Sequence, residues 1–166
     1  MATLLALDLG TKTGWALGRS LDKDGYIDGG TKNLGKEPGV GQAFCDWLHY
    51  LIHIDNTMDV VYEKVYAHKG VLAAHRYGGF ESMLRMVCHK YPDVKISSYT
   101  PTQIKKYLTG SGRASKQDMI RYCSYLPWGI KPVDDNHADA LGLLFTALTD
   151  KRFKETCQPS GETNGK

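Results

Sequence analysis

The sequence predicts a single α/β domain with a central, mixed five-stranded sheet flanked by helices, and three observations lead to this prediction. The chain has 166 residues, 42% of them hydrophobic and 23% charged, which is the size and balance of one globular domain with a substantial core. Three short strand-like segments joined by glycine-rich breaks come first, which indicates an antiparallel meander. Helical and strand-like segments then alternate, which is typical of parallel strands flanked by helices.

The first three strands are expected at 3–8, 13–18 and 25–28. The first is a short apolar run that ends on Asp8 and is stopped by Gly10, a pattern that favours a buried strand over a helix. Breaks rich in glycine and aspartate separate the next two segments and favour hairpin connections. The meander therefore begins with a strand that ends on a carboxylate.

The middle of the chain predicts a helix, a strand and a long helix. Apolar residues recur at three- and four-residue steps over 41–54, which indicates an amphipathic helix. The strand at 58–63 has an apolar middle and, like the first strand, ends on a carboxylate, here Glu63. A helix is expected over 71–91, although the glycine pair at 78–79 weakens this pattern near its middle.

The last part of the chain predicts one strand and three helices, at 94–99, from 101 onward, at 116–125 and at 134–148. Pro101 suits a first helical turn, and Ser115 suits the N-cap of the next helix, after the polar loop 109–114. The folded domain is expected to span 1–150. Residues 151–166 are polar and aperiodic, which predicts a disordered tail.

Charge and hydropathy exclude several classes of protein. The net charge of +3, from 21 Lys and Arg against 18 Asp and Glu, is too small to indicate nucleic-acid binding by itself. No window approaches eighteen consecutive apolar residues, and the first residues lack the basic segment of a signal peptide. We therefore expect a cytoplasmic protein without a membrane partner.

Carboxylates at the ends of elements indicate a metal site. If the strands that end on Asp8 and Glu63 are neighbours, the two side chains emerge at the same edge of the sheet, where Asp139 of the last helix can join them. Close carboxylates repel one another unless a hard cation neutralises them. We therefore expect Mg²⁺ or Mn²⁺, and two such ions about 4 Å apart can hydrolyse a phosphodiester. Taken singly, each aspartate is equally compatible with a turn or a helix cap.

The fourth ligand of this predicted site is left open between two neighbours. At 3.6 residues per turn, Asp135 lies about 40° and Asn136 about 60° from Asp139 around the helix, whereas His137 lies about 160° away. Asp135 offers a charged carboxylate and Asn136 only a neutral carbonyl, so charge favours Asp135.

Together these features resemble the RuvC-type Holliday junction resolvases of the RNase H-like superfamily, in particular a phage or phage-derived member. The match spans about residues 3–148 and rests on four motifs in the family's order, at 5–10 with 13–16 behind it, at 60–63, at 110–116 and at 138–143. The resemblance implies an RNase H-like fold and a crossover junction endodeoxyribonuclease, a homodimer that resolves four-way DNA junctions by paired phosphodiester hydrolysis with two metal ions per site.

The resemblance also implies roles for individual residues. Asp8, Glu63 and Asp139 take the positions of metal ligands, but the family's remaining ligand position holds Asn136, which is a departure from the pattern. Lys116 is placed to stabilise charge on the scissile phosphate. The predicted catalytic residues are Asp8, Glu63, Asp135, Asp139 and Lys116, with Asn136 as a further metal ligand.

A second set of residues is predicted to contact DNA. Tyr66 follows the strand glutamate at the place where such enzymes carry an aromatic residue near the unpaired junction centre, and basic residues flank it and the glycine-containing loop. The predicted set is Tyr66, His68, Lys69, Arg76, Lys105, Lys106, Arg113 and Lys116. A solvated helix face explains several of these residues nearly as well.

Three alternatives remain beside the resolvase. A nuclease with broader preference would also cut forks and flaps, and a related family of small RNase H-like proteins acts in ribosomal RNA maturation. A catalytically silent nucleic-acid-binding module is favoured only by Asn136. The glycine-containing motif after Asp8 also resembles a phosphate loop of actin-like ATPases, but those need two such domains, so no nucleotide cofactor is expected.

Overall fold

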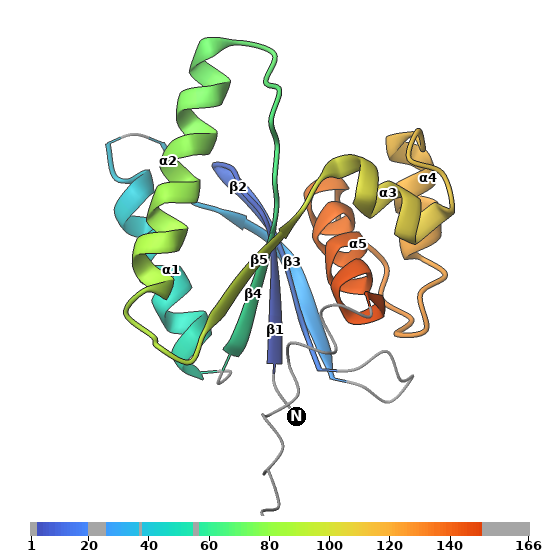
Figure 1. Ribbon diagram of the computed structural model, residues 1–166, viewed down its shortest axis with the longest axis horizontal. Coiled ribbons are helices and arrows are strands. Elements are labelled where there is room, and N and C mark those ends of the chain that lie inside the picture. The colour runs from blue at the N-terminus through green and yellow to red at the C-terminus, as the bar shows by residue number, and fades with distance from the viewer. Residues whose placement is uncertain (1–2, 20–25, 37, 55–56, 151–166) are drawn as a thin grey trace, which may run out of the picture.

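The fold is a mixed five-stranded sheet with helices on both faces, as a computed structural model shows (Figure 1). The structure describes residues 3–19, 26–36, 38–54 and 57–150. The strand order is β3-β2-β1-β4-β5. The strands are β1 (Thr3–Asp8), β2 (Lys12–Gly18), β3 (Ile27–Asn33), β4 (Thr57–Glu63) and β5 (Lys95–Tyr99).

The sheet joins an antiparallel meander to parallel strands. The β1–β2 and β2–β3 pairs are antiparallel, whereas β1–β4 and β4–β5 are parallel. The strand β1 lies at the centre between β2 and β4, with its side chains fully buried on both faces from Leu5 to Leu7. Because β1 and β4 are parallel neighbours, their carboxyl ends lie at the same edge of the sheet, as the sequence predicted.

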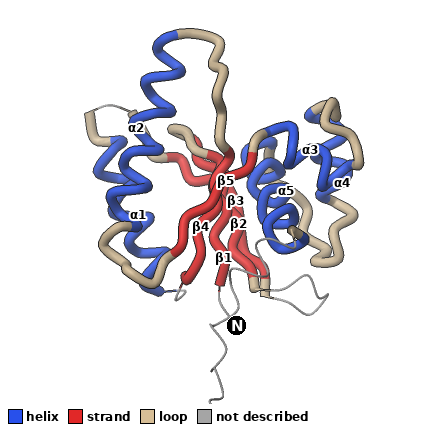
Figure 2. The backbone as a smooth tube through the Cα atoms, viewed as in Figure 1, coloured by secondary structure: helices blue, strands red, loops and turns tan. Residues whose placement is uncertain are grey.

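Two helices cover one face of the sheet, α1 (Val40–Ile54) and α2 (Val71–Cys88). Their apolar stripes pack on the inward side chains of β1 and β4, and Phe44 meets Phe80 edge to face at 5.1 Å between ring centroids. The segment after β4 and the first turns of α2 extend beyond the edge of the sheet, at the top of the views (Figures 1 and 2).

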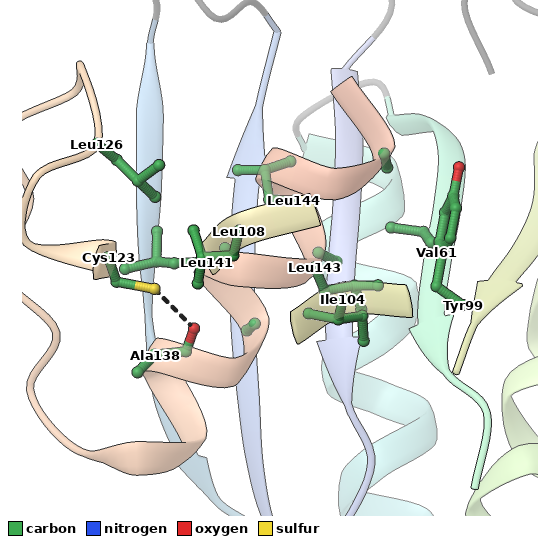
Figure 3. Packing of buried hydrophobic residues seen from close by; sticks show 14 of the residues in the cluster. Val61, Tyr99, Ile104, Leu108, Cys123, Leu126, Ala138, Leu141, Leu143 and Leu144 are labelled. Atoms are coloured by element: carbon green, nitrogen blue, oxygen red, sulfur yellow. Dashed lines mark hydrogen bonds between the residues drawn. The ribbon is translucent and has the colours of Figure 1, made fainter. Parts of the chain in front are cut away.

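Three helices cover the opposite face, α3 (Pro101–Thr109), α4 (Lys116–Cys123) and α5 (Asp135–Thr149). The helix α5 lies against the sheet, and Leu141, Leu143 and Leu144 are completely buried in a second core cluster, with Ile104 and Leu108 of α3 beside them (Figure 3). The thiol of Cys123 donates a hydrogen bond to the carbonyl oxygen of Ala138 at 3.2 Å, which joins α4 to α5.

Two helices start where the sequence predicted, and each start is capped by side chains. Thr100 and Gln103 form a capping box before α3, and Pro101 occupies its first turn. Ser115 and Asp118 form a second capping box, which starts α4 directly after the glycine-containing loop. Lys116 is therefore the first residue of α4, in a position fixed by a reciprocal pair of hydrogen bonds.

Three element boundaries were predicted wrongly. The strand β3 extends to Asn33 instead of ending at 28, because its backbone pairs with β2 along the whole length although Gly29 and Gly30 interrupt any side-chain pattern. The helix α2 ends at Cys88 instead of 91, where the chain tightens into turns before Pro92. Likewise α4 ends at Cys123 instead of 125.

The glycine pair at 78–79 does not interrupt α2. The predicted tail at 151–166 lies outside the described residues. Within the described ranges, no helix combines the length and the apolar character needed to cross a lipid bilayer.

Candidate active site

Asp8 and Glu63 lie side by side at one edge of the sheet. Leu7 of β1 is level with Tyr62 of β4, so the next residues, Asp8 and Glu63, end the two parallel strands at the same height. Side chains alternate between the faces of a sheet, and Leu7 and Tyr62 point into the cluster under α1 and α2. The two carboxylates therefore face the opposite layer, where α5 lies.

The helix α5 supplies the third carboxylate, Asp139, and its first turn is anchored to the meander. Asp134 caps the helix by accepting a hydrogen bond from the backbone N–H of His137 at 2.9 Å, and the hydroxyl of Thr31 on β3 donates to the same oxygen at 2.5 Å. His137 is buried, and its Nδ1 accepts a hydrogen bond from the N–H of Val133 at 3.2 Å. This side chain is held away from the carboxylates, as the helix geometry predicted.

Gly14 allows α5 to approach the sheet beside Asp8. Gly14 of β2 is the cross-strand partner of Asp8, and a Cβ atom at this position would overlap the backbone carbonyl oxygen of Asn136. Any side chain here would push the first turn of α5 outward. The absence of a side chain at Gly14 therefore sets the distance between α5 and the strand that ends on Asp8.

The three carboxylates interact electrostatically. Burial raises the pKa of Asp8 well above its usual range, and repulsion from Glu63 and Asp139 raises it further. Burial, with repulsion from Asp139, raises the pKa of Glu63 to about 7. Burial also raises the pKa of Asp139 to about 6, against the attraction of Lys116 and Lys105. The site therefore carries more negative charge than its surroundings neutralise.

Two lysines face this negative charge. The ammonium group of Lys116 forms an ion pair with Asp135 at 2.7 Å and interacts electrostatically with Asp8 and Asp139. Lys105 of α3 is half-buried and lowers the pKa values of Glu63 and Asp139. The hydrogen bond from Lys116 lowers the pKa of the Asp135 carboxyl.

Both candidates for the fourth metal ligand lie in the first turn of α5. Asp135 is paired with Lys116 at the mouth of the site, with 46% of its side chain exposed, and its charge raises the pKa values of Asp8 and Asp139. Asn136 has its backbone against Gly14 in the same helical turn. Both residues lie where the helical geometry placed them, and both stay candidates.

The chemistry of the donor set fits a hard cation. Three carboxylates whose pKa values are raised by partial burial and by neighbouring negative charge meet at one edge of the sheet, and oxygen ligands of this kind are those that Mg²⁺ and Mn²⁺ prefer. In the part of the chain that the structure describes, no three His, Cys, Asp or Glu side chains already stand in a geometry for binding a metal ion. Asp8, Glu63 and Asp139 would hold a cation after side-chain adjustment.

The predicted DNA-contacting residues fall into two groups. Tyr66 and Lys69 are exposed on the segment between β4 and α2, close to half-buried His68 and exposed Arg76. On the other side of the carboxylates, Lys106 and Arg113 are exposed on α3 and on the loop that follows it. The carboxylates thus lie between two basic, solvent-facing segments, whose role in DNA binding stays a prediction.

Tyr77 is a positioning residue that the sequence did not reveal. Its hydroxyl donates a hydrogen bond to the carbonyl oxygen of Glu63 at 2.7 Å and accepts one from the N–H of Val65 at 3.3 Å. It therefore holds the chain at the end of β4. Glu81 is the second such residue, and it binds the hydroxyl of Tyr62 and the ammonium group of Lys64. No motif marks either residue, because their role depends on how α2 packs on β4.

Glu63→Gln is expected to raise the stability of the metal-free protein at pH 8. The pKa of Glu63 is about 7 in the folded state against 4.5 as its ordinary value, so the folded protein holds this proton more tightly. The stabilisation from that proton is present below pH 4.5 and is lost as the pH rises through 7. Removing the charge should therefore stabilise the fold by about 1–3 kcal/mol at pH 8, with little effect near pH 4.5.

Thermal denaturation in EDTA across this pH range measures the effect, and Glu81→Gln is the matched control. Burial of Glu81 opposes ionisation, but hydrogen bonds from Lys64, Tyr62 and Arg85 outweigh it and lower the pKa of Glu81. Glu81→Gln should therefore destabilise the protein at pH 8. A Glu63→Gln protein that melts below the wild type at pH 8 would contradict the charge repulsion inferred for the site.

Comparisons with known proteins agree with this architecture. Residues 30–147 match the family model described as crossover junction endodeoxyribonuclease RuvC. A RuvC from Wolbachia pipientis is 27% identical over 159 residues, which are 92% of this chain and 96% of that protein. A RuvC from Petrotoga mobilis is 34% identical over 115 residues, which are 69% of this chain and 68% of that protein.

Solved structures share the fold. A Thermus thermophilus RuvC in complex with Holliday junction substrate superimposes with a TM-score of 0.77 at 18% identity, over 89% of this chain and 93% of that one. A second Thermus thermophilus RuvC structure gives a TM-score of 0.73 at 20% identity, over 87% of this chain and 92% of that one. The expected RNase H-like fold is confirmed.

Proposed function

The chain belongs to the RuvC family of crossover junction endodeoxyribonucleases, and we propose that it resolves Holliday junctions by hydrolysing phosphodiesters at the Asp8–Glu63–Asp139 site. The single observation that carries this proposal is the juxtaposition of the three carboxylates. The parallel pairing of β1 and β4 and the close approach of α5 at Gly14 produce it. Burial and neighbouring negative charge raise their pKa values, and the positive charge of a bound cation would offset both effects.

We infer that Asp8, Glu63 and Asp139 hold two Mg²⁺ or Mn²⁺ ions, with Asp135 or Asn136 completing the set. When bound, such ions generate a nucleophilic hydroxide and stabilise the leaving oxygen of the phosphodiester. The protein's own contribution is to hold the three carboxylates at one point and to keep Lys116 beside them. Asp8 interacts electrostatically with both other carboxylates, so its carboxylate would be the central one in holding the ions.

Lys116 is proposed to act on the scissile phosphate. Its side chain is 73% exposed and its ammonium group contacts Asp135 at 2.7 Å, so this group is available to an incoming phosphate oxygen. Charge that develops on the phosphate during hydrolysis would attract it. Asp135 then serves to keep this lysine over the carboxylates in the absence of DNA.

The proposed substrate is branched DNA, in particular the four-way junction. A four-way junction is two-fold symmetric, and two paired cuts require two active sites, so we propose a homodimer. Forks and flaps are the alternative substrates. The relatives described above are bacterial, which supports action in the cytoplasm of a bacterial or phage-infected cell.

The function is tested with end-labelled four-way junction, fork, flap and linear duplex DNA, with Mg²⁺ or Mn²⁺. We expect paired, symmetric cuts in the junction that leave 5′-phosphate ends, and no cuts in the duplex. Cuts at similar rates in all branched substrates would point to a broader branch nuclease. Junction binding without any cut in either metal would favour the silent binding module.

Lys116→Ala is expected to lower the cleavage rate at saturating junction about tenfold to a hundredfold, with affinity changed less than about threefold, because an interaction made mainly in the transition state affects turnover. Single-turnover cleavage and binding in EDTA separate the two effects. Lys106→Ala is the matched control, because Lys106 is exposed on α3 and should change affinity alone. Equal losses of rate and affinity in Lys116→Ala would make this lysine a phosphate anchor.

A further inference from the structure

The inward face of α2 continues past the edge of the sheet. Phe80, Leu84 and Val87 on this face are buried against the strands. One to two turns nearer the N-terminus, the same face presents Ala73 and Arg76, which are both exposed. In Figure 1 this part of α2 stands beyond the carboxyl ends of the strands. The face of α2 that packs in the core from Phe80 onward is therefore open to solvent in the first turns of the helix.

Two adjoining hollows occupy that space. The first, of about 320 Å³, lies between α2 and the turn that joins β1 to β2, and is lined by Leu9, Val65 and Phe80 among others. The second, of about 380 Å³, shares Thr11, Arg76 and Phe80 with the first and extends to the start of α1. Each volume lies in the range of small-molecule sites, roughly 300–1,000 Å³.

The walls of the first hollow are fixed to the same strand ends as the candidate catalytic residues. Leu9, Gly10 and Thr11 directly follow Asp8, and Val65 comes two residues after Glu63. Tyr77 lines the hollow and holds the end of β4 through its hydrogen bonds to the backbone of Glu63 and Val65. A ligand here would therefore lie at the same strand ends as the carboxylates, on the face of the sheet that α1 and α2 cover.

The charge of the lining favours an anion. Among the described residues, the charged or titratable nitrogen side chains around the two hollows are Arg76, His68 and His75, and no described Asp or Glu lines either hollow. Within the described residues, the structure shows no hydrogen bond or ion pair to the guanidinium group of Arg76. An exposed guanidinium without a protein acceptor suits a phosphate group.

The remaining lining favours a planar ring. The rings of His68 and Tyr77 lie 4.9 Å apart between centroids, and Leu9, Val65 and Phe80 add apolar surface. Nucleobases stack on aromatic side chains regardless of their sequence. A phosphate-binding group beside an aromatic and apolar wall is the combination that a nucleotide requires.

We propose that these hollows bind one nucleotide of the substrate strand next to the scissile phosphate, with its base against the His68–Tyr77 wall and a phosphate at Arg76. The inference rests on the proposed function, because it places this nucleotide beside the phosphate that the carboxylates cut. In this proposal the hollows hold an unpaired base, and the bound base fixes the position of the DNA strand relative to Asp8 and Glu63. A base inside a duplex cannot enter, so the site selects DNA with an unpaired nucleotide at this position.

The test scans a four-way junction with single abasic nucleotides around its centre and measures affinity in EDTA. With the wild-type protein, one position should lower affinity about fivefold or more, the effect of losing one stacked base. Ala73→Trp fills the first hollow and should lower affinity for the intact junction by a similar factor. In this variant the abasic position should cause no further loss, because the two changes remove the same interaction.

Leu72→Trp is the matched control, because Leu72 is exposed on the same helix and lines neither hollow. It should bind like the wild type. Arg76→Ala should weaken binding of intact and abasic junctions equally and reduce the salt dependence, and Arg76→Lys should restore most of the affinity. Thermal denaturation of Ala73→Trp verifies folding, and Ala73→Leu serves as a smaller filling variant.

Two outcomes would overturn the proposal. Ala73→Trp and Arg76→Ala could bind all junctions like the wild type, or the abasic penalty could persist unchanged in Ala73→Trp. Failure of the proposed function is a separate result, since it would show as a wild-type protein that cuts no branched DNA. The binding scan is read without any cleavage, so the two failures are distinguishable.

Discussion

Asp8→Asn is expected to abolish junction cleavage while leaving junction binding nearly unchanged. The pKa of Asp8 is raised by burial and then by repulsion from Glu63 and Asp139, so this carboxylate lies at the centre of the negative charge. Losing this ligand removes charge from the proposed metal site. We expect the rate to fall at least about a thousandfold, corresponding to several kcal/mol of lost transition-state stabilisation.

The measurement is single-turnover cleavage with Mg²⁺ and with Mn²⁺, together with affinity for the junction in EDTA. Asp28→Asn is the matched control, because Asp28 is an exposed aspartate on β3 outside the carboxylate cluster. It should cleave at the wild-type rate. An Asp8→Asn protein that retains normal turnover would remove the carboxylates from the mechanism, and a parallel loss of junction binding would indicate damage to the DNA-binding surface.

Gly14→Ala is expected to reduce cleavage about a hundredfold, although it adds only one methyl group and replaces none of the proposed ligands. The new Cβ would overlap the carbonyl oxygen of Asn136, so the first turn of α5 must move away from β2. That movement carries Asp135 and Asp139 away from Asp8. A displacement of about 1 Å in a catalytic arrangement can cost about 10²-fold in rate, and overpacking costs about 1–3 kcal/mol of stability.

Gly30→Ala is the control for this experiment. Gly30 lies in the neighbouring strand β3, and a Cβ there would meet only the indole nitrogen of Trp15 at 3.5 Å, an ordinary contact. Cleavage rate and thermal denaturation should both stay near the wild-type values. If Gly14→Ala cleaved like Gly30→Ala, the position of α5 would not depend on this close approach.

The sequence predicted the sheet and the three carboxylates because both depend on short-range patterns. The apolar runs that end on Asp8 and Glu63 are buried strands in the structure, and these strands pair in parallel although β2, β3 and α1 lie between them in the sequence. The end of β3 was missed because Gly29 and Gly30 carry no side chain to form a pattern, while the backbone still pairs with β2.

Contacts between distant elements could not be predicted in this way. The ion pair between Lys116 and Asp135 joins the first residues of α4 and α5, and it depends on how the Cys123 thiol and the surrounding core dock the two helices. The helical angle alone placed Asp135 near Asp139 but did not reveal its partner. The hollows at the strand ends could not be predicted for the same reason. In the sequence, the basic residues of α2 are equally compatible with a solvated helix face, and only the structure shows that α2 extends beyond the edge of the sheet.

The division of the core into two clusters has a consequence for cooperativity. The layer of α3, α4 and α5 packs on one face of the sheet and the layer of α1 and α2 on the other, so the two layers share strands but few side-chain contacts. Such layers can open separately, at a free-energy cost below that of global unfolding. Asp139 belongs to one layer, whereas Asp8 and Glu63 belong to the sheet. A cation bound by all three carboxylates would raise the free energy needed to open that layer. Metal binding and the local opening of α5 are therefore expected to be thermodynamically linked.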